Sequence, residues 1–237
     1  MRYISGILLL LFLFCSCRKE TKRLEHFEMH GIDVSHYQSK IDWNKVVGED
    51  IDFSFVKASE GEELQDSTFM YNWSEINRVG MKRGAYHFFR PSASSILQAL
   101  NFTAVVDLKP GDLPPVLDIE VIDGVSTKLM VNRAEIWLDI IEKHYKIRPI
   151  IYTNLKFYNK HIADNFKGYP IWIARYNYEA PTLKYGTDWQ FWQYGNRGQL
   201  EGIEGDVDFN VFNGTYEALS EMTVPEETDL SDVVIGD

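Results

Sequence analysis

Short apolar segments separated by polar stretches recur along the chain from about residue 30 to residue 212. Eight of them have the length and the β-branched or aromatic content of strands: 30–35, 53–59, 83–89, 115–120, 148–154, 169–175, 189–194 and 206–212. Helical spacing of apolar residues predicts helices over 68–79, 94–108 and 126–145, the last with Ser126 as its N-cap. The later gaps are shorter and richer in glycine, which indicates fewer helices there.

This alternation of strands and helices indicates a parallel sheet, and eight strands suffice to close such a sheet into a barrel. We therefore predict an α/β fold, a TIM-like (β/α) barrel of eight strands with some helices missing in the later half. The barrel domain is expected to span residues 30–222, a length typical of one barrel domain. Functional side chains in such barrels lie at the carboxyl ends of the strands.

The first 17 residues differ in composition from the rest of the chain. One positive charge is followed by an apolar run over residues 4–14 and then by Cys15-Ser16-Cys17. The run is shorter than the roughly 20 apolar residues of a spanning helix, and the pattern is typical of a secretion signal. It resembles a bacterial lipoprotein signal and predicts lipid attachment at Cys17, hence a membrane-anchored protein of the cell envelope outside the cytoplasm. An ordinary cleaved signal or an uncleaved anchor is the alternative.

Polar segments flank the predicted barrel. Residues 18–29 are charged and are interpreted as a tether, whereas residues 223–237 are acidic, contain no Lys or Arg, and are predicted to be disordered. The net charge of −11 argues against nucleic acid as a partner, because basic patches bind nucleic acid. Cleavage at Cys17 would leave no other cysteine and no internal disulfide. We expect a monomer.

Four carboxylates fall at or near the ends of predicted strands: Asp33, Asp118, Glu120 and Asp208. Asp118 and Glu120 share one face of their strand, roughly 7 Å apart at the backbone. Like charges raise the pKa of at least one carboxyl, and a protonated carboxyl is what glycosidic cleavage requires. We predict that Glu120 is the general acid and that Asp118 orients a substrate group or the acid. The alternative is that these acids cap helices or pair with Lys57 and Arg175.

Aromatic and polar residues near the strand ends are candidates for sugar binding, because aromatic faces stack on sugar rings and buried hydroxyls need partners. The predicted substrate-binding residues are Tyr86, Phe88, Tyr152, Tyr176, Trp189, Gln193, Lys57 and Glu60. Core packing is the alternative for the aromatic members. The chain shows neither the His or Cys spacing of a zinc site nor a nucleotide-binding fingerprint, so we expect no metal and no cofactor.

Taken in order, the motifs resemble those of glycoside hydrolase family 25, the lysozymes of N-acetylmuramidase (Chalaropsis) type. The likeness covers about residues 30–213 and rests on GIDVSHYQ, FSFVKASEG, GAYHFF, PPVLDIE, PIIYTN, IWIARY, FWQYG and GIEGDVDFNVF. It implies cleavage of the β-1,4 bond between N-acetylmuramic acid and N-acetylglucosamine in the glycan strands of peptidoglycan. It also implies that the four acids occupy the family's acidic positions, with Glu120 as the acid. Ser59 departs from the family, which more often has Thr there.

Two other functions remain open from the sequence. A chitinase-like glycosidase also uses a D-x-E pair on a barrel strand, but the upstream acids typical of that class are absent from LPPVLDIE. A non-catalytic cell-wall-binding protein on the same barrel would be indicated by a missing acid, and all four are present.

Overall fold

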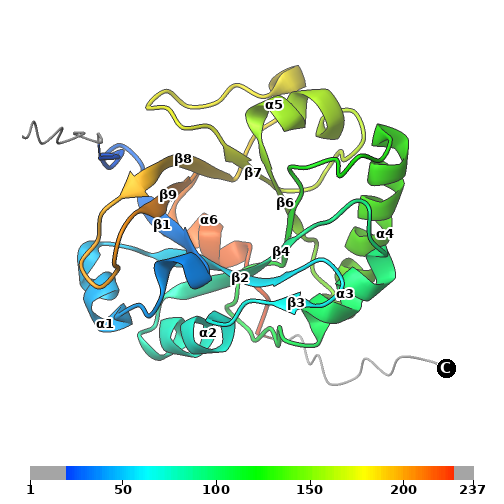
Figure 1. Cartoon of the computed structure of the whole chain (residues 1–237). Coiled ribbons are helices and arrows are strands. Elements are labelled where there is room, and N and C mark those ends of the chain that lie inside the picture. The colour runs from blue at the N-terminus through cyan, green and yellow to red at the C-terminus, as the bar shows by residue number, and fades with distance from the viewer. Residues whose placement is uncertain (1–19, 227–237) are drawn as a thin grey trace, which may run out of the picture.

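The computed structural model describes residues 20–226, and its central feature is a closed barrel (Figure 1). The barrel strands are β1 (Met29–Val34), β2 (Phe53–Glu60), β4 (Lys82–Phe88), β5 (Val116–Asp118), β6 (Ile150–Asn154), β7 (Ile171–Ala174), β8 (Phe191–Gly198) and β9 (Val207–Phe212). The short β3 (Leu64–Gln65) pairs only with the end of β2. Because β1 pairs with both β2 and β9, the ring is closed, and the predicted eight-stranded α/β barrel is confirmed.

The last strand runs against the others. From β1 to β8 the pairings within the barrel are parallel, whereas β9 is antiparallel to both β8 and β1. The prediction of a parallel sheet was therefore wrong for this strand. The reason is the short connection over residues 199–206, since a parallel return needs a crossover of about a dozen residues or more. As a consequence, β9 begins at the end of the barrel where the other strands finish.

Helices cover the first half of the barrel at the predicted places. They are α2 (Phe69–Arg78), α3 (Ser95–Thr103) and α4 (Thr127–Tyr145). Ser126 is the N-cap of α4, since its side chain accepts a hydrogen bond from the backbone N–H of Leu129. Only α3 is clearly shorter than predicted, because it ends at Thr103 rather than at residue 108.

The remaining helical segments are short, and for those after β6 this agrees with the prediction of fewer helices in the later half. Those before β2 are η1 (His36–Gln38), α1 (Trp43–Val46) and η2 (Val47–Glu49). The later ones are α5 (Leu155–Phe157), the π-turn η3 (Tyr158–Ile162), η4 (Lys184–Gly186) and α6 (Tyr216–Glu221). In the described part of the chain, none of the helices is long and apolar enough to span a membrane.

Apolar side chains form two clusters, one on each side of the barrel wall. The interior cluster contains Phe53, Phe55, Trp172 and Phe191, and the rings of Phe55 and Trp172 stack with centroids 4.4 Å apart. The outer cluster lies between the wall and the helices and includes Ile32, on the side opposite to the pocket-lining Asp33. This division follows from the alternation of side chains along a strand. The interior rings fill the lower part of the barrel and leave its upper end for polar residues.

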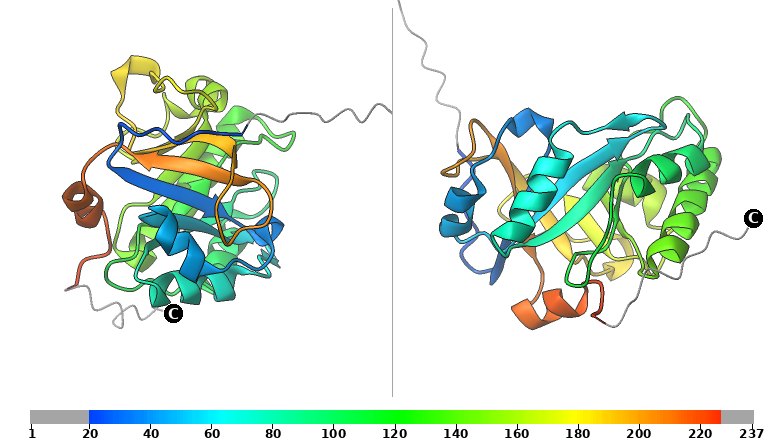
Figure 2. Two further views of the ribbon diagram at one scale, coloured as in Figure 1. Left: turned by 90° about the vertical axis from the view of Figure 1, so that its left-hand side faces the viewer. Right: turned by 90° about the horizontal axis from the view of Figure 1, so that it is seen from below.

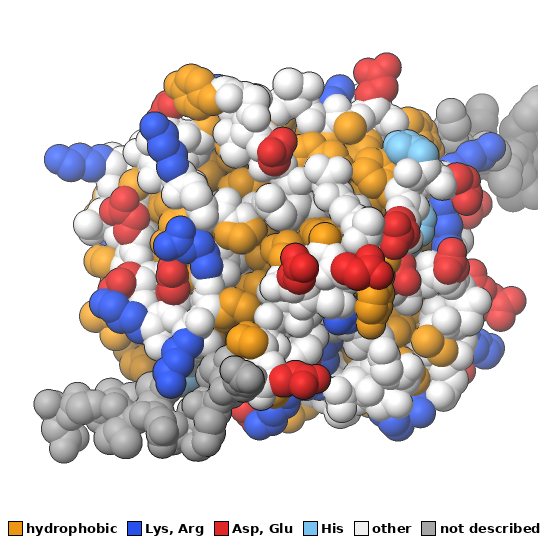
Figure 3. All heavy atoms as spheres, turned by 180° about the vertical axis from the view of Figure 1, so that it is seen from behind, with side chains coloured by type: hydrophobic (Ala, Val, Ile, Leu, Met, Phe, Trp, Pro, Cys, Tyr) orange, Lys and Arg blue, Asp and Glu red, His pale blue; other side chains and the backbone are white. Residues whose placement is uncertain are grey.

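The lower end of the barrel is covered by α6, whose Leu219 belongs to the interior cluster (Figure 2). Acidic, basic and apolar side chains are interspersed over this face, as Figure 3 shows from behind. The chain after α6 returns to the barrel, because Val224 is buried and its N–H donates to the carbonyl of Asp112 at 2.8 Å. Residues 227–237 of the predicted acidic tail lie outside the described residues.

The chain before β1 runs along the barrel beside β8 (Figure 2). The N–H of Thr21 donates to the carbonyl of Arg197 at 2.9 Å, and the N–H of Arg197 donates to Thr21 Oγ1 at 3.2 Å. Leu24 is buried, and the ring of Phe27 lies 6.0 Å from that of Trp189. The part of residues 18–29 that the structure describes therefore contacts the barrel along its length. The predicted signal segment, residues 1–17 with Cys17, lies outside the described residues.

A buried ion pair joins β4 to the loop before β5. Arg83 donates from Nε and Nη2 to the two carboxylate oxygens of Asp112, at 2.7 and 3.1 Å. Its Nη1 donates to the carbonyl of Trp73 at 2.6 Å, and its guanidinium lies 4.0 Å from the centroid of the Trp73 ring. Both charged side chains are buried.

We expect Asp112→Ala to lower the free energy of unfolding by about 3–5 kcal/mol, because it leaves the Arg83 guanidinium buried without its carboxylate. The exposed pair of Lys143 with Asp139 supplies the control, and Asp139→Ala should change the free energy by less than about 1 kcal/mol. Urea denaturation followed by tryptophan fluorescence measures both values. Equal losses in the two variants would contradict the importance of the buried pair.

Candidate active site

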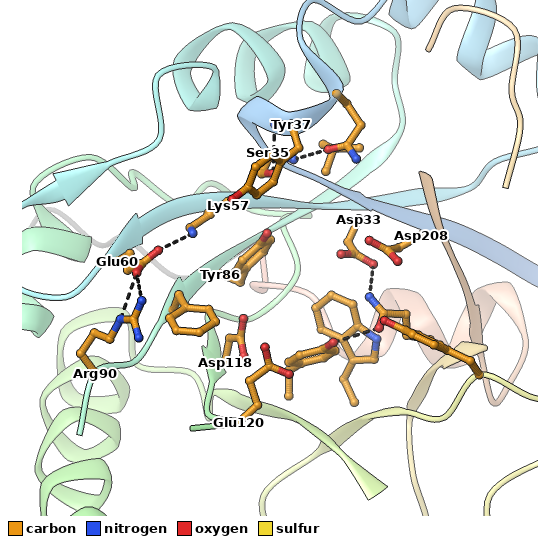
Figure 4. A pocket seen from close by; sticks show the side chains of 17 residues that line it. Asp33, Ser35, Tyr37, Lys57, Glu60, Tyr86, Arg90, Asp118, Glu120 and Asp208 are labelled. Atoms are coloured by element: carbon orange, nitrogen blue, oxygen red, sulfur yellow. Dashed lines mark hydrogen bonds and ion pairs between the residues drawn. The ribbon is translucent and has the colours of Figure 1, made fainter. Parts of the chain in front are cut away.

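A cavity of about 450 Å³ opens at the end of the barrel where the parallel strands finish (Figure 4). All four predicted acids line it, together with seven of the eight predicted substrate-binding residues: Asp33, Asp118, Glu120, Asp208, Tyr86, Phe88, Tyr152, Tyr176, Gln193, Lys57 and Glu60. The cavity therefore lies where active sites of such barrels are found.

The four carboxyl groups are arranged as two pairs. Asp33 near the end of β1 lies opposite Asp208 near the start of β9, as antiparallel cross-strand partners. Asp118 ends β5. The sequence pattern predicted that Glu120 would end this strand, but Glu120 lies on the loop that follows it. In Figure 4 the side chains of Asp118 and Glu120 lie close together, while Asp33 and Asp208 form the second pair beyond Tyr86.

Asp33 is held by two amide groups. Its Oδ2 accepts from Gln193 Nε2 at 2.8 Å and from Asn210 Nδ2 at 2.7 Å. The two amides are themselves oriented, because Tyr152 Oη donates to Gln193 Oε1 and Trp172 Nε1 donates to Asn210 Oδ1. Burial raises the pKa of Asp33 to about 6, although both hydrogen bonds act to lower it.

Asp208 has the more strongly raised pKa of this pair. Burial is the main cause, the neighbouring charge of Asp33 adds to it, and the pKa reaches about 8. Because two buried carboxyls that face each other titrate as a unit, the Asp33–Asp208 pair retains a proton near neutral pH. The pair can therefore both donate to and accept from a sugar hydroxyl.

The two members of the second pair differ in burial, since Asp118 is more deeply buried than Glu120. Asp118 is buried, and its Oδ1 has no hydrogen-bond partner within residues 20–226. Burial raises its pKa well above the usual range, the charge of Glu120 raises it further, and Lys57 lowers it. Burial also raises the pKa of Glu120, against a hydrogen bond from Asn154 that lowers it. A glutamic acid with a raised pKa keeps its proton at a higher pH than an exposed one, which is the property of a general acid.

A charged network forms the edge of the cavity next to β2 and β4. Glu60 accepts from Lys57 Nζ at 2.6 Å and from Arg90 Nε at 2.9 Å. The ring of Phe88 lies 5.2 Å from Lys57 Nζ and 4.8 Å from the guanidinium of Arg90. Burial alone would raise the pKa of Glu60, but the hydrogen bonds from Lys57 and Arg90 bring it below the usual value. Glu60 is therefore ionised and positions the two cations.

Two tyrosine hydroxyls face the acids. Tyr86 lies between the two carboxyl pairs in Figure 4, and burial raises its pKa well above the ordinary value. Partial burial, together with the nearby acids, also raises the pKa of Tyr176, although this residue stands at the rim with 56% of its surface exposed. Both side chains therefore stay protonated and can donate to a ligand.

Trp189 is the predicted site residue that the structure does not bring to the cavity. It precedes β8, so it lies toward the closed end of the barrel rather than at the mouth. Its Nε1 donates to the carbonyl of Pro181 at 3.1 Å, and its ring packs against those of Phe27 and Trp192. These contacts are those of a core residue, the alternative considered for the aromatic candidates.

Several site residues were missed by the sequence analysis: Ser35, Tyr37, Gln38, Arg90, Asn154, Trp172 and Asn210. Some had a usable signal, because Asn210 shares the strand face of Asp208 and Tyr37 lies in the GIDVSHYQ motif. Ser59, the departure from the family pattern, is buried and its hydroxyl pairs with His87 Nδ1 at 2.8 Å. Within residues 20–226, no group of three or more His, Cys, Asp or Glu residues is arranged to hold a metal ion.

Comparison with known proteins agrees with this geometry. The family model of glycosyl hydrolases family 25 matches residues 32–203. The chain belongs to this family. It is 37% identical over 206 residues to lysozyme M1 of Streptomyces globisporus, a match that covers 79% of this chain and 68% of that protein. It is 45% identical over 198 residues to the uncharacterized protein YegX of Escherichia coli, with 81% and 72% covered.

A solved structure shows the same architecture. The family 25 glycosyl hydrolase from Bacillus anthracis matches with a TM-score of 0.81 and 32% sequence identity, covering 86% of this chain and 98% of that one. The resemblance seen in the sequence motifs is thereby confirmed. This family 25 chain is a glycoside hydrolase, and the acid-lined cavity at the barrel mouth is its candidate active site.

In this family 25 hydrolase, Asn154→Ser should raise the pKa of Glu120 further. The variant keeps a good N-cap for α5, where Asn154 Oδ1 accepts from the N–H of Phe157 at 2.9 Å, but it loses the amide that stabilises the ionised Glu120. Isotope-edited NMR titration of the carboxyl groups measures the change, with the pKa of Asp164, which the hydrogen bond from Tyr185 lowers and which does not depend on Glu120, as an internal control that stays unchanged. A Glu120 pKa that falls would show that Asn154 does not act in this way.

Proposed function

We propose that this chain hydrolyses the β-1,4 bond between N-acetylmuramic acid and N-acetylglucosamine in peptidoglycan, with Glu120 as the general acid. The observation that carries the proposal is the Asp118–Glu120 pair at the barrel mouth, in which Asp118 is buried, Glu120 is half-buried and both pKa values are raised. The similarity to lysozyme M1 supports the substrate class. The full set of acids in one cavity gives no support to the non-catalytic alternative, and the family match favours a muramidase over a chitinase-like enzyme.

The proton must reside on Glu120 when substrate is bound. In the free site the deeper Asp118 competes for it, because both pKa values are raised. A sugar that covers the mouth removes water from Glu120 and so raises its pKa further. An acetamido N–H that donates to the unpartnered Asp118 Oδ1 favours the ionised form of Asp118. Substrate binding therefore shifts the proton to Glu120, the carboxyl nearer the mouth.

Cleavage then proceeds in two stages, and the first forms a cyclic intermediate. The bond from the anomeric carbon to the leaving oxygen breaks, and that oxygen takes the proton of Glu120. The acetamido carbonyl oxygen of the same sugar bonds to the anomeric carbon, while Asp118 holds the acetamido N–H and stabilises the positive charge that develops on this group. In the second stage a water molecule gives a proton to the ionised Glu120, and its oxygen bonds to the anomeric carbon. The bond from this carbon to the acetamido oxygen breaks, which restores the acetamido group and the protonated Glu120. Asp118 thus acts on the substrate amide, which is the orienting role predicted from the sequence.

The remaining acids and the aromatic residues bind the sugar. The protonated Asp33–Asp208 pair faces the cavity opposite Asp118, and Tyr152 with Gln193 fixes its orientation through hydrogen bonds. Tyr86, Phe88 and Tyr176 offer ring faces and hydroxyls to the substrate. Lys57 and Glu60 form the charged edge of the same binding site.

We expect Glu120→Gln to reduce the rate of hydrolysis by about 10²–10⁴-fold, because the amide has a similar shape but delivers no proton. Release of reducing ends from purified peptidoglycan measures the rate, and pelleting with insoluble wall measures binding, which should persist. Glu135→Gln on the exposed face of α4 is the control and should leave both unchanged. Hydrolysis by Glu120→Gln at nearly the wild-type rate would refute the assignment.

Asp118→Asn distinguishes the two roles within the same experiment. Its rate should also fall, but the alkaline limb of the pH profile should remain, because Glu120 still titrates. The limb should move to lower pH, since removing a neighbouring negative charge lowers the pKa of Glu120 and the acid loses its proton earlier. Glu120→Gln, by contrast, should lose this limb.

We further propose that the mature enzyme is held at a membrane of the bacterial cell envelope by lipid on Cys17, and that it acts outside the cytoplasm as a monomer. The sequence pattern of residues 1–17 supports this location. Cys17→Ser should move the protein from the membrane fraction to the soluble fraction, with Cys15→Ser as the matched control that stays in the membrane. Continued incorporation of labelled fatty acid into the Cys17 variant would show the attachment site to be elsewhere.

A further inference from the structure

A second hollow adjoins the catalytic cavity on the side of β7 and β8. It has a volume of about 380 Å³, which is within the range of ligand pockets, and Tyr176 lines both spaces. Its other walls come from the loop after β7, the second half of β8 and the segment before β1, and they include Asn177, Tyr178, Asn196, Arg197 and Thr21. We call this space the β8 hollow. A polymeric ligand that fills the catalytic cavity can therefore continue past Tyr176 into the β8 hollow.

The β8 hollow carries groups that suit a sugar. Tyr176 and Tyr178 expose 56% and 48% of their surfaces, which leaves ring faces available for stacking. Asn177 fixes the loop between them, since its Oδ1 accepts from the N–H groups of Tyr178 at 2.7 Å and Glu179 at 3.0 Å. The hydroxyl of Tyr178 accepts from the N–H of Lys22 at 3.2 Å. The ring is therefore positioned before any ligand binds.

The segment before β1 forms part of the wall of this hollow. Beyond Gln193, β8 extends past the end of β7, and Thr21 pairs with Arg197 through hydrogen bonds in both directions. The contact depends on Gly195, because a Cβ at that position would overlap the side chain of Thr21. The residues between the predicted lipid anchor and the barrel thus help to shape a surface next to the catalytic cavity.

The charge of the two sides of the cavity differs. On the side of Arg90, the adjoining shallow hollow is lined by Glu62 and Glu63 as well as by Arg90, so its two carboxylates outnumber its one cation and disfavour a ligand that carries carboxylates. On the side of the β8 hollow, the exposed Arg197 attracts such a ligand. A glycan strand with carboxylate substituents is therefore favoured on the side of Tyr176.

We propose that the β8 hollow is a remote saccharide subsite, which binds a further unit of the glycan strand beyond the sugars at the catalytic acids. Tyr178 stacks on the face of that sugar, and Arg197 with the neighbouring amides binds its polar and anionic substituents. This proposal rests on the proposed muramidase function, because a muramidase binds a polymeric glycan strand that can extend into the hollow. It predicts an enzyme that prefers long glycan strands over short fragments.

The test compares Tyr178→Ala with Tyr185→Ala, an exposed tyrosine outside both spaces whose hydroxyl donates to Asp164. The substrates are peptidoglycan tetrasaccharides, which we expect to occupy mainly the sites at the catalytic acids, and octasaccharides, which are long enough to reach the β8 hollow as well. On the octasaccharide, kcat/KM of Tyr178→Ala should fall about 3- to 10-fold, mainly through KM, as expected for loss of one stacking contact. On the tetrasaccharide it should match the wild type, as should Tyr185→Ala on both.

A binding measurement separates this proposal from the proposed function. Calorimetric titration of octasaccharide into Glu120→Gln and into the double variant Glu120→Gln/Tyr178→Ala should show the same 3- to 10-fold loss without turnover. Arg197→Ala provides a second variant if Tyr178→Ala does not fold. Unchanged octasaccharide affinity, or equal loss on both substrate lengths, would overturn the subsite. Wild-type enzyme that cleaves neither substrate would refute the muramidase instead, and the titration would still decide the subsite.

Discussion

The antiparallel insertion of β9 between β8 and β1 is the constraint on which the site depends. It closes the barrel, and it places the start of β9 at the mouth, so that Asp208 lies opposite Asp33. Two residues further along the same face, Asn210 donates to Asp33 and accepts from Trp172. A parallel strand in this position would have carried Asp208 to the closed end. One strand direction therefore creates both the carboxyl pair and the network that holds it.

The second requirement is burial of acids above an apolar plug. Interior rings such as Phe55 and Trp172 fill the barrel below the site and limit its access to water. Burial raises the pKa of Asp33 and of Asp208 to about 6 and about 8. Between the ordinary and the raised pKa the folded protein holds protons that the unfolded chain releases, so these groups make it less stable as pH rises.

Much of the fold and of the site could be predicted from the sequence. Strand positions, the three long helices and the N-cap at Ser126 follow from local periodicity and capping chemistry, which need no knowledge of distant contacts. The same alternation placed Asp118 and Glu120 on one face, and the order of the motifs indicated the family. Eleven of the twelve predicted catalytic and substrate-binding residues line the cavity for this reason.

By itself, then, the sequence determined which residues form strands and which face of each strand carries the acids, because both depend on neighbours in the chain. Only the tertiary structure decided the direction of β9 and which further residues line the cavity. It excludes Trp189 from the lining and includes Arg90 and Trp172. It also decided that residues 20–28 contact the barrel beside β8 and that burial raises the pKa values of the acids in the cavity. These outcomes depend on contacts between residues far apart in the chain and on exclusion of water, which no local pattern records.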